Sequence, residues 1–460
     1  MFVSVFFVTE KFAMQKFYYI STNKFIKLID IMKYFALKNE LYIDNRKNYI
    51  KHLKPNSLAL FVSNDILPTN GDGSFGFVQN SDLLHLSGID QEDIILMLFP
   101  DVKDGKHKEV LFIKETSDLI AVWEGAKLTK EQAKEASGIE NIYWIHEFDK
   151  VFKGFVFQAE NIYLNSNEHT RRSIDMETAE MRFNKKIKEQ FPLHTIQRSA
   201  PIMHRIRAIK HPLEIEQIQQ ACNITEKGFR RLLNFVKPGV MEYEIEAELI
   251  HEFVRNRSRG FAYGPIIASG ANACVLHYVE NNRVCKDGDV ILLDVAAEYA
   301  NYASDMTRAI PVNGKYTKRQ KEVYNAVLRV MKSATSMLKV GNTFEKYNKA
   351  VGELMTEELL QLGLIKSDEV KNQNPAWPAF KKYFMHGTSH FLGLDVHDVG
   401  FFTEPMQAGM VFTCEPGIYI PEEGLGIRLE NNILITPNGN DDLMKNIPLE
   451  VDEIEALMNK

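Results

Sequence analysis

Five side chains that are far apart in the sequence could together hold metal ions. Asp294 ends an apolar run of strand length, and Asp305 follows eleven residues later. Glu415 ends a second apolar run, Glu430 lies within a third, and His390 lies in a His-Gly-Thr-Ser-His segment. Burying an unpaired carboxylate costs several kcal/mol or shifts its pKa. Acids placed beside apolar strands therefore need partners.

Two divalent cations would balance the charge of these four carboxylates. An oxygen-rich donor set with one imidazole favours Mn²⁺, Mg²⁺ or Fe²⁺ over metals that prefer thiolates. Two such ions, about 3.5–4 Å apart, can hold a bridging water or hydroxide. Each residue also has an ordinary structural explanation: a turn acid for either aspartate, a solvated strand-edge acid for Glu430 and a hydrogen-bonded core residue for His390. Residue types and spacing leave both interpretations open.

The predicted elements around these residues occur in the same order twice. Each time, two helices are followed by strands. Pro212 is suited to the first turn of a helix, and a Lys-Pro-Gly segment at 237–239 ends that helix. Thr317 with Gln320 forms a capping-box signature for the first helix of the second repeat of this order. The order predicts two related halves that close over one site, with both aspartates at one end of a hairpin. The predicted helices cover 212–236, 242–254, 317–338 and 344–362, and the predicted strands cover 264–269, 290–295, 302–312, 410–415 and 426–435.

The part of the chain from about 32 to 200 reads as mixed α/β. A stretch at 71–76 matches GxGxxG, but the dinucleotide motif requires a strand directly before it and a helix directly after it. Pro-Thr-Asn precedes the stretch and Phe-Val-Gln follows it, so we predict a plain loop. Because long amphipathic helices begin after 199–211, we expect domains at 32–204 and 205–460. The predicted strands in the first domain are 57–63, 93–99, 109–113 and 161–164, and its predicted helices include 129–136 and 176–189.

Composition excludes several classes of protein. The chain has 460 residues, 45% hydrophobic and 25% charged, which is ordinary for a globular protein of two or three domains. Its net charge is −6 with no long basic block, so we expect no nucleic-acid partner. None of the four cysteines forms a CxxC pair, which argues against a zinc ribbon or thioredoxin-like site. Such sparse cysteine use predicts a reducing, cytoplasmic location.

The first 31 residues do not fit a targeting or membrane segment. The apolar start is short, has no basic stretch before it and is followed by scattered lysines without a small-residue cleavage site. A membrane span needs about 20 apolar residues. We therefore expect 1–31 to be an extension outside the native fold, arising from an upstream start codon, and expect no membrane partner. The alternative is a weak membrane-surface anchor.

Several motifs, in order, resemble those of the Xaa-Pro aminopeptidases, also called aminopeptidase P. They are GPIIASGANACVLHYVENN and DGDVILLDVAAEYANYASDMTR within 264–308, PVNGK at 311–315, FMHGTSHFLGLDVHDVG at 384–400, GMVFTCEPGIYI at 409–420 and GIRLENNILIT at 426–436. The RAIK segment at 207–210 and the QNSD segment at 79–82 resemble that family as well. The resemblance runs from about Met32 to the end of the chain.

The resemblance implies an α/β protein with a smaller creatinase-like N-terminal α/β domain and a C-terminal pita-bread catalytic domain. It implies that two divalent ions, Mn²⁺ before Co²⁺, Fe²⁺ or Zn²⁺, are held by Asp294, Asp305, His390, Glu415 and Glu430. All five family positions are filled, unlike those of metal-free relatives such as creatinase. It further implies a homodimer or homotetramer that acts on peptides with proline at the second position.

The resemblance also assigns roles around the metals. Glu415 is expected to move the proton of the attacking water, while His277 and His397 bind the substrate carbonyl and stabilise the developing negative charge. His386 is expected at the proline subsite, and Arg428 is expected to bind substrate and support the ligands. Thr307 and Asp398 are expected to orient ligands, Tyr419 to line the pocket and Asp82 to lie where the N-terminal domain walls the site.

Three alternatives remain at this point. A prolidase would share the fold and metals but cleave Xaa-Pro dipeptides. The sequence Thr-Ser-His at 388–390 resembles aminopeptidase P more than it resembles a prolidase. A methionine aminopeptidase usually lacks such an N-terminal domain. A non-enzymatic binding protein on the same fold would usually have lost metal ligands, whereas this chain keeps all five.

Overall fold

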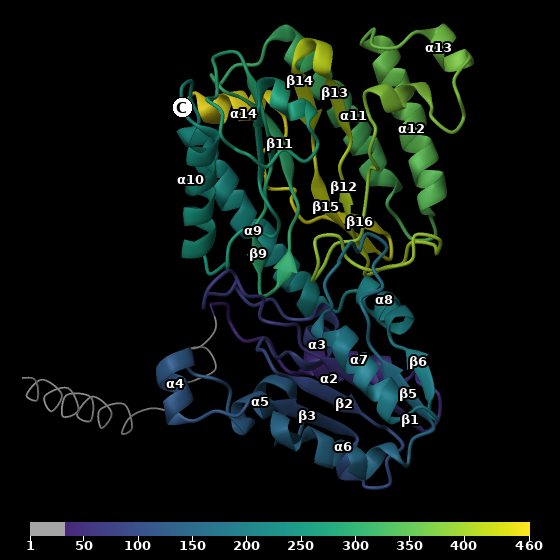
Figure 1. Cartoon of the computed structure of the whole chain (residues 1–460). Helices are drawn as coiled ribbons and strands as arrows, with labels where there is room; N and C mark the ends of the chain where they lie inside the picture. The colour runs from purple at the N-terminus through teal and green to yellow at the C-terminus, as the bar shows by residue number, and fades with distance from the viewer. Residues whose placement is uncertain (1–32) are drawn as a thin grey trace, which may run out of the picture.

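The computed structural model describes residues 33–460 (Figure 1). The expected extension at 1–31 lies outside the described residues. Within them the chain forms a smaller α/β unit and a larger one, stacked with the connecting helix α8 (Ala200–Ala208) between them (Figure 1). The expected boundary at 204/205 falls inside α8 and stays a prediction.

A six-stranded mixed sheet is the frame of the N-terminal unit. Its strand order is β4-β3-β2-β1-β5-β6, with β1 antiparallel to β2 and β2 antiparallel to β3, and with the other neighbours parallel. The strands are β1 (Ser57–Val62), β2 (Ile95–Leu98), β3 (Glu109–Ile113), β4 (Asn141–Trp144), β5 (Asn161–Leu164) and β6 (Thr195–Arg198).

Helices cover both faces of this sheet, because successive side chains of a strand point to opposite sides. Phe61 packs with α2, α3, α5 and α8 on one face, and Leu60 packs with α6 and α7 on the other. The helices are α2 (Glu40–Ile50), α3 (Ser81–Ser87), α4 (Asp118–Glu124), α5 (Lys130–Ser137), α6 (Phe148–Val156) and α7 (Ala179–Gln190). The 71–76 stretch is a loop closed by the bridge between Pro68 and Ser74, as predicted.

The C-terminal unit repeats the predicted order of helices and strands. Helices α9 and α10 stand beside the strands β11-β8-β7, and α11 and α12 stand beside β12 and β13 (Figure 1). The helices are α9 (Pro212–Phe235), α10 (Glu242–Arg255), α11 (Lys318–Met337), α12 (Phe344–Gln361), α13 (Ser367–Lys371) and α14 (Val451–Met458). The strands are β7 (Ile266–Ser269), β8 (Val290–Asp294), β9 (Glu298–Tyr299), β10 (Tyr302–Ala303), β11 (Thr307–Pro311), β12 (Val411–Cys414), β13 (Gly417–Ile420), β14 (Leu425–Arg428), β15 (Asn431–Thr436) and β16 (Gly439–Asp442).

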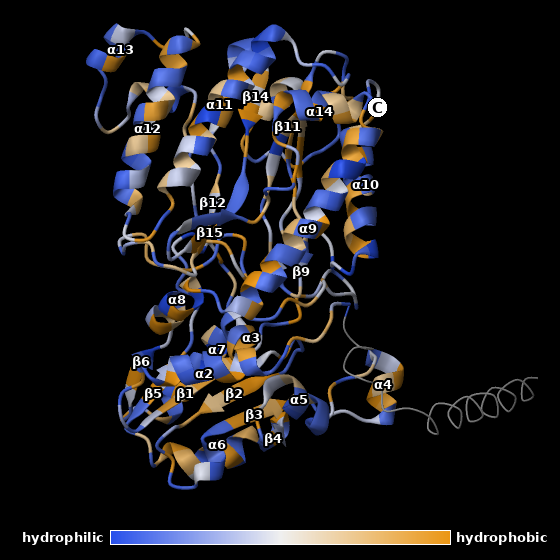
Figure 2. Cartoon of the chain, turned by 180° about the vertical axis from the view of Figure 1, so that it is seen from behind, coloured by the Kyte–Doolittle hydropathy of each residue, from blue (hydrophilic) through white to orange (hydrophobic). Residues whose placement is uncertain are grey.

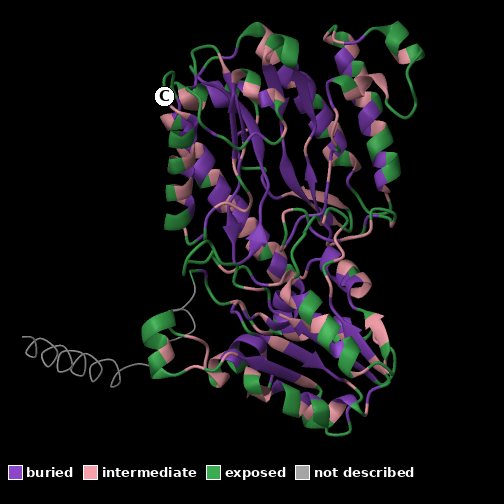
Figure 3. Ribbon diagram, in the orientation of Figure 1, coloured by how far each residue is buried: buried purple, intermediate pink, exposed green. Residues whose placement is uncertain are grey.

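Helix amphipathicity explains how this unit packs. The helices carry both hydrophobic and hydrophilic residues (Figure 2), and their inner faces join the strands in a large apolar core, beside which a smaller cluster includes Ile266, Leu292 and Tyr419. The strands are almost wholly buried, while the outer faces of the helices are exposed (Figure 3). Pro212 begins α9, and Thr317 with Gln320 forms the predicted capping box of α11. No helix within residues 33–460 is long and apolar enough to cross a lipid bilayer.

Two of the predicted strands are each interrupted. The strand expected at 302–312 is divided into β10 and β11 by residues 304–306, and the one expected at 426–435 is divided into β14 and β15 by residues 429–430. Each break contains a predicted metal ligand, Asp305 in the first and Glu430 in the second.

Candidate metal centre

The first two carboxylates come from one hairpin, as predicted. Asp294 is the last residue of β8 and lies opposite Thr307 of the antiparallel strand β11. The Val295 amide donates to the Met306 carbonyl at 3.0 Å, just beyond that pair. Asp305 therefore sits at the same end of the hairpin as Asp294.

The two glutamates come from the strands of the second half. Glu415 directly follows β12, and Glu430 directly precedes β15. These strands are antiparallel, with Cys414 opposite Asn431, so both glutamates lie at one end of the pair. The Glu430 amide donates to the Thr307 carbonyl at 3.1 Å, which joins this end to the hairpin of the first half.

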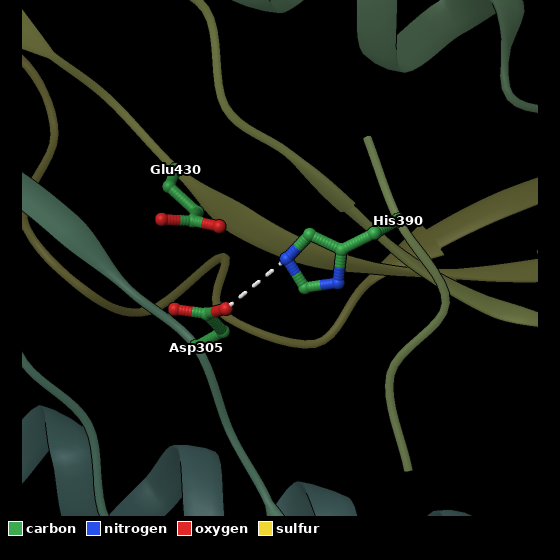
Figure 4. Close-up of side chains that lie close together, drawn as sticks. All are labelled: Asp305, His390 and Glu430. Atoms are coloured by element: carbon green, nitrogen blue, oxygen red, sulfur yellow. Dashed lines mark ion pairs between the residues drawn. The ribbon is translucent and has the colours of Figure 1, made fainter. Parts of the chain in front are cut away.

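His390 completes the cluster from a segment beside β12. Its Nδ1 donates to the Phe391 carbonyl at 2.9 Å, which leaves Nε2 facing the acids. Nε2 lies 3.4 Å from Asp305 Oδ2 and 3.7 Å from Glu415 Oε1. Ligand atoms of His390, Asp305 and Glu430 all lie within 4.8 Å of one another, and their side chains converge in Figure 4.

Asp294 faces the cluster with its carboxylate already engaged. One oxygen accepts from the Tyr263 hydroxyl and the other from Arg428 Nη2, each at 2.6 Å. Arg428 also donates to Thr307 Oγ1 at 3.1 Å, and Thr307 donates to Glu430 Oε2 at 2.7 Å. The buried Arg428 and Thr307 thus hydrogen-bond two of the predicted ligands, Asp294 and Glu430.

Asp294, Glu415 and Glu430 resist ionisation where they lie. Burial raises the pKa of Asp294, opposed by Arg428 and reinforced by Asp305. Burial raises the pKa of Glu415 to about 7, and burial followed by the charge of Asp305 raises the pKa of Glu430. Burial lowers the pKa of His390, but its bond with Asp305 and the charge of Glu415 outweigh that effect and raise it overall.

This donor set fits divalent cations. Acids that raise one another's pKa in a buried site lack positive charge, and a bound cation supplies it. Hard oxygen ligands with one neutral imidazole suit Mn²⁺, Fe²⁺ or Co²⁺ better than thiolate-preferring ions. The backbone bond at His390 Nδ1 fixes the tautomer whose Nε2 is free to bind, a common support for metal-bound histidine.

Two histidines flank the ligands on the side open to solvent. His397 is exposed, and its ring packs edge-on against His390 with centroids 4.5 Å apart. His386 Nε2 accepts from the Tyr419 hydroxyl at 2.8 Å, while its Nδ1 donates to the Gly387 carbonyl. Burial lowers the pKa of His386 to about 3, and burial together with the charge of His390 lowers that of His397 to about 4. Both rings are therefore neutral at pH 7.

The remaining predicted site residues take different positions. His277 is exposed and follows the short helix η4 (Gly270–Cys274). Tyr419 receives a hydrogen bond from Arg428 Nη1 at 2.7 Å and passes one to His386, so it connects Asp294 to the histidine side of the site.

The prediction that Asp398 orients a metal ligand was wrong. Its carboxylate accepts from Arg207 and Lys210 and from the Val399 amide. Asp82 also accepts from Arg207, so it lies in the same ion-pair cluster between the two units. The signal for this cluster was present in the Arg-Ala-Ile-Lys segment at 207–210, but its partners lie far away in the sequence.

Two residues that hydrogen-bond predicted metal ligands, Tyr263 and Asn432, were not predicted from the sequence. Tyr263 bonds Asp294 as described above, and it directly precedes one of the motifs. Asn432 Oδ1 accepts from the Asp305 amide at 3.0 Å, and its Nδ2 donates to the Asp305 carbonyl at 2.7 Å. Asn432 lies two residues after Glu430, within the motif at 426–436, and this proximity to a ligand could have drawn attention to it.

Known families match both units of the chain. Residues 42–163 match the model for the aminopeptidase P N-terminal domain, and residues 216–437 match the model for metallopeptidase family M24. The Xaa-Pro aminopeptidase of Haemophilus influenzae is 34% identical over 92% of this chain and 98% of its own length. Human Xaa-Pro aminopeptidase 3 is 30% identical over 87% of this chain and 81% of its own length.

Solved structures agree with these matches. Zinc-substituted aminopeptidase P of Escherichia coli in complex with product has a TM-score of 0.82 at 31% identity, covering 92% of this chain and 99% of the solved chain. The same enzyme with the inhibitor Pro-Leu gives the same values. The fold and the acidic site define a pita-bread metallopeptidase. The chain belongs to the Xaa-Pro aminopeptidases of metallopeptidase family M24, which confirms the predicted fold, the enzyme class and the need for divalent metal ions.

Proposed function

We propose that this enzyme hydrolyses the bond between an N-terminal residue and a following proline in peptides, with two Mn²⁺ ions as its natural metals. The observation that supports this most is the buried convergence of Asp305, His390 and Glu430, with Glu415 and Asp294 beside them. The two ions, held by these five residues, would supply a water of lowered pKa and a site for the substrate's free amino group.

The residues of this chain would carry the remaining steps. Glu415 takes the proton of the attacking water and passes it to the proline nitrogen, acting first as a general base and then as a general acid. His397 and His277 donate to the carbonyl oxygen as negative charge develops on it. A neutral His397 is suited to this, because its ring N–H donates without adding a full charge beside His390.

The proline subsite would lie at His386. The bonds from Arg428 to Tyr419 and from Tyr419 to His386 hold this ring in one orientation. Arg428 contributes to substrate binding through this chain of hydrogen bonds, since the whole residue is only 4% exposed. The substrates would be peptides with proline at position two.

We further propose a cytoplasmic homodimer or homotetramer that binds neither nucleic acid nor membranes. The four cysteines, Cys222, Cys274, Cys285 and Cys414, carry free thiols, which suits a reducing compartment. Sedimentation equilibrium of the full chain tests the assembly, and fractionation of cells tests the location.

The defining experiment compares an Xaa-Pro-Yaa tripeptide with an Xaa-Pro dipeptide, each with Mn²⁺ and with a chelator. We expect release of the first residue from the tripeptide only with metal. Cleavage of the dipeptide alone would make the enzyme a prolidase. Cleavage of neither by folded, metal-loaded protein would refute the proposed reaction. A comparison of Mn²⁺, Co²⁺, Fe²⁺ and Zn²⁺ at equal occupancy identifies the metal that supports turnover best.

A further inference from the structure

A buried ion-pair cluster joins the two units at the loop that carries His390 and His397. Arg207, near the end of α8, donates through Nη1 to Asp82 Oδ1 of α3 at 2.8 Å. Through Nη2 it donates to Asp395 Oδ2 at 2.7 Å and to Asp398 Oδ1. The side chains of Arg207 and Asp398 are 4% and 1% exposed. One guanidinium thus connects the N-terminal unit to the loop.

Asp398 is held on every side by this cluster. Lys210 Nζ donates to its second oxygen at 2.8 Å and to the Arg207 carbonyl at 2.6 Å. The Asp398 amide donates to the Phe391 carbonyl at 2.9 Å, and its first oxygen accepts from the Val399 amide. The loop is therefore fixed at 391 and 398, the neighbours of the two histidines.

Close packing leaves this loop little freedom. A Cβ atom at Gly393 would lie 2.1 Å from Asp398 Oδ2 and 2.8 Å from Lys210 Nζ, so the ion pair sits directly on this glycine. The Gly393 carbonyl accepts from the Ala303 amide at 2.8 Å, two residues before Asp305. The loop is thus confined between the ion pair and the backbone that leads to a metal ligand.

We propose that Arg207 is a positioning residue for hydrolysis, acting through Asp398 to hold His397 against the substrate carbonyl. The N-terminal unit, through Asp82, thereby sets the orientation of a group in the site. This inference rests on the proposed function of His397. The guanidinium suits the task, because its rigid planar fork directs separate nitrogens at Asp82 and Asp398, a geometry that the point charge of a flexible lysine does not fix.

The test compares Arg207→Ala and Arg207→Lys with Arg205→Ala. Arg205 lies on the same helix and forms an ion pair with Glu404 of the C-terminal unit, so its loss also removes a contact between the units. With the tripeptide and saturating metal, we expect Arg207→Ala to lower kcat about 10-fold to 100-fold, the scale expected for a misplacement of about 1 Å. KM and bound metal should stay near wild type. Arg207→Lys should be intermediate, and Arg205→Ala should keep the wild-type kcat.

Hydrogen exchange provides a readout that needs no substrate. The amides of Asp398 and Val399 should exchange faster in both Arg207 variants than in wild type and in Arg205→Ala. The proposal is overturned if Arg207→Ala keeps the wild-type kcat and exchange rates, or if Arg205→Ala lowers kcat as much as Arg207→Ala does. It is also overturned if added metal fully restores the kcat of Arg207→Ala. If Arg207→Ala does not fold, wild-type behaviour of Arg207→Lys overturns it. Failure of wild type to cleave would refute the reaction, while the exchange rates would still test the hold on the loop.

Discussion

Two buried groups of acids lie close together in this molecule and have opposite electrostatics. The metal centre brings four carboxylates together, and burial with mutual repulsion raises the pKa of Asp294, Glu415 and Glu430. In the cluster between the units, the charges of Arg207 and Lys210 overcome the effect of burial and lower the pKa of Asp398. The first group has Arg428 beside Asp294 but less positive charge than its four acids need, whereas the second places both Arg207 and Lys210 on Asp398.

The comparison separates a binding site from a structural one. A buried carboxylate that already has its cations is stabilised in the charged form and has no need of a ligand. A group of acids that hold one another above their usual pKa gains most from an external cation. Burial and acidic character are shared by both clusters, so the sign of the pKa shift is the informative difference.

The largest effect on stability is expected from Asp398→Asn. Removing one partner of a buried ion pair leaves an uncompensated charge and costs about 3–5 kcal/mol of unfolding free energy. Urea unfolding at pH 7 measures this loss. The matched variant Glu404→Gln breaks the exposed pair with Arg205 and should cost at most about 1 kcal/mol.

The pH dependence of that loss tests its electrostatic origin. Because the pKa of Asp398 is lowered on folding, its contribution is complete above the unfolded pKa, about 3.9 for aspartate, and disappears as pH falls through the folded pKa. The difference between wild type and Asp398→Asn should therefore be constant from pH 5 to 8 and shrink below about pH 4. A difference unchanged at low pH would mean that packing, not charge, holds the loop.

The next effect concerns the metal centre. Glu415→Gln should lower kcat by about 10²-fold or more, the usual scale for the loss of a proton-transferring group. Bound metal must be measured in the same samples, because Glu415 is also a predicted ligand. His397→Ala, which removes no predicted ligand, should lower kcat to a similar degree with full metal content. Near-native turnover in a metal-replete variant would remove that residue from the mechanism.

The sequence predicted most of the elements that frame both clusters. Regular hydrophobic periodicity and local caps are properties of neighbouring residues, so β3, β5, α9 and α10 begin and end close to their expected bounds. The chemistry of the metal ligands was visible for a related reason. Asp294 and Glu415 each end an apolar run, where an acid is costly without a partner.

The strand breaks and the second cluster depend on contacts that the local pattern does not contain. Residues 304–306 leave the strand where the Asp305 amide bonds the side chain of Asn432, 127 residues away. The break at 429–430 depends on the bond from the Glu430 amide to Thr307. Asp398 resembled a residue that orients a ligand because of its neighbours in sequence, whereas its partner Arg207 is 191 residues away.

A smaller effect on stability, opposite in sign to that of Asp398→Asn, is expected from Glu430→Gln in metal-free protein. Glu430→Gln replaces an acid whose pKa is raised by burial and by Asp305 with a neutral amide that keeps an acceptor for Thr307, so the metal-free variant should be at least as stable as metal-free wild type. Wild type should gain about 1.4 kcal/mol from Mn²⁺ at ten times its Kd, and the variant should gain less because a ligand is lost. Unfolding midpoints with Mn²⁺ and with chelator measure both quantities. A metal-free variant less stable than wild type would contradict the shortage of positive charge.

The smallest effect is expected at Tyr419→Phe. The ring would keep its buried place, but Arg428 Nη1 and His386 Nε2 would lose their shared hydroxyl, at a cost of about 1 kcal/mol in unfolding free energy. Because His386 would also lose its fixed orientation, KM for the tripeptide should rise while kcat changes less. Tyr324→Phe is the matched control, since it removes a hydroxyl bonded to the Leu449 carbonyl and should leave KM unchanged. Equal KM values in both variants would separate Arg428 from the proline subsite and leave it as a support for Asp294 alone.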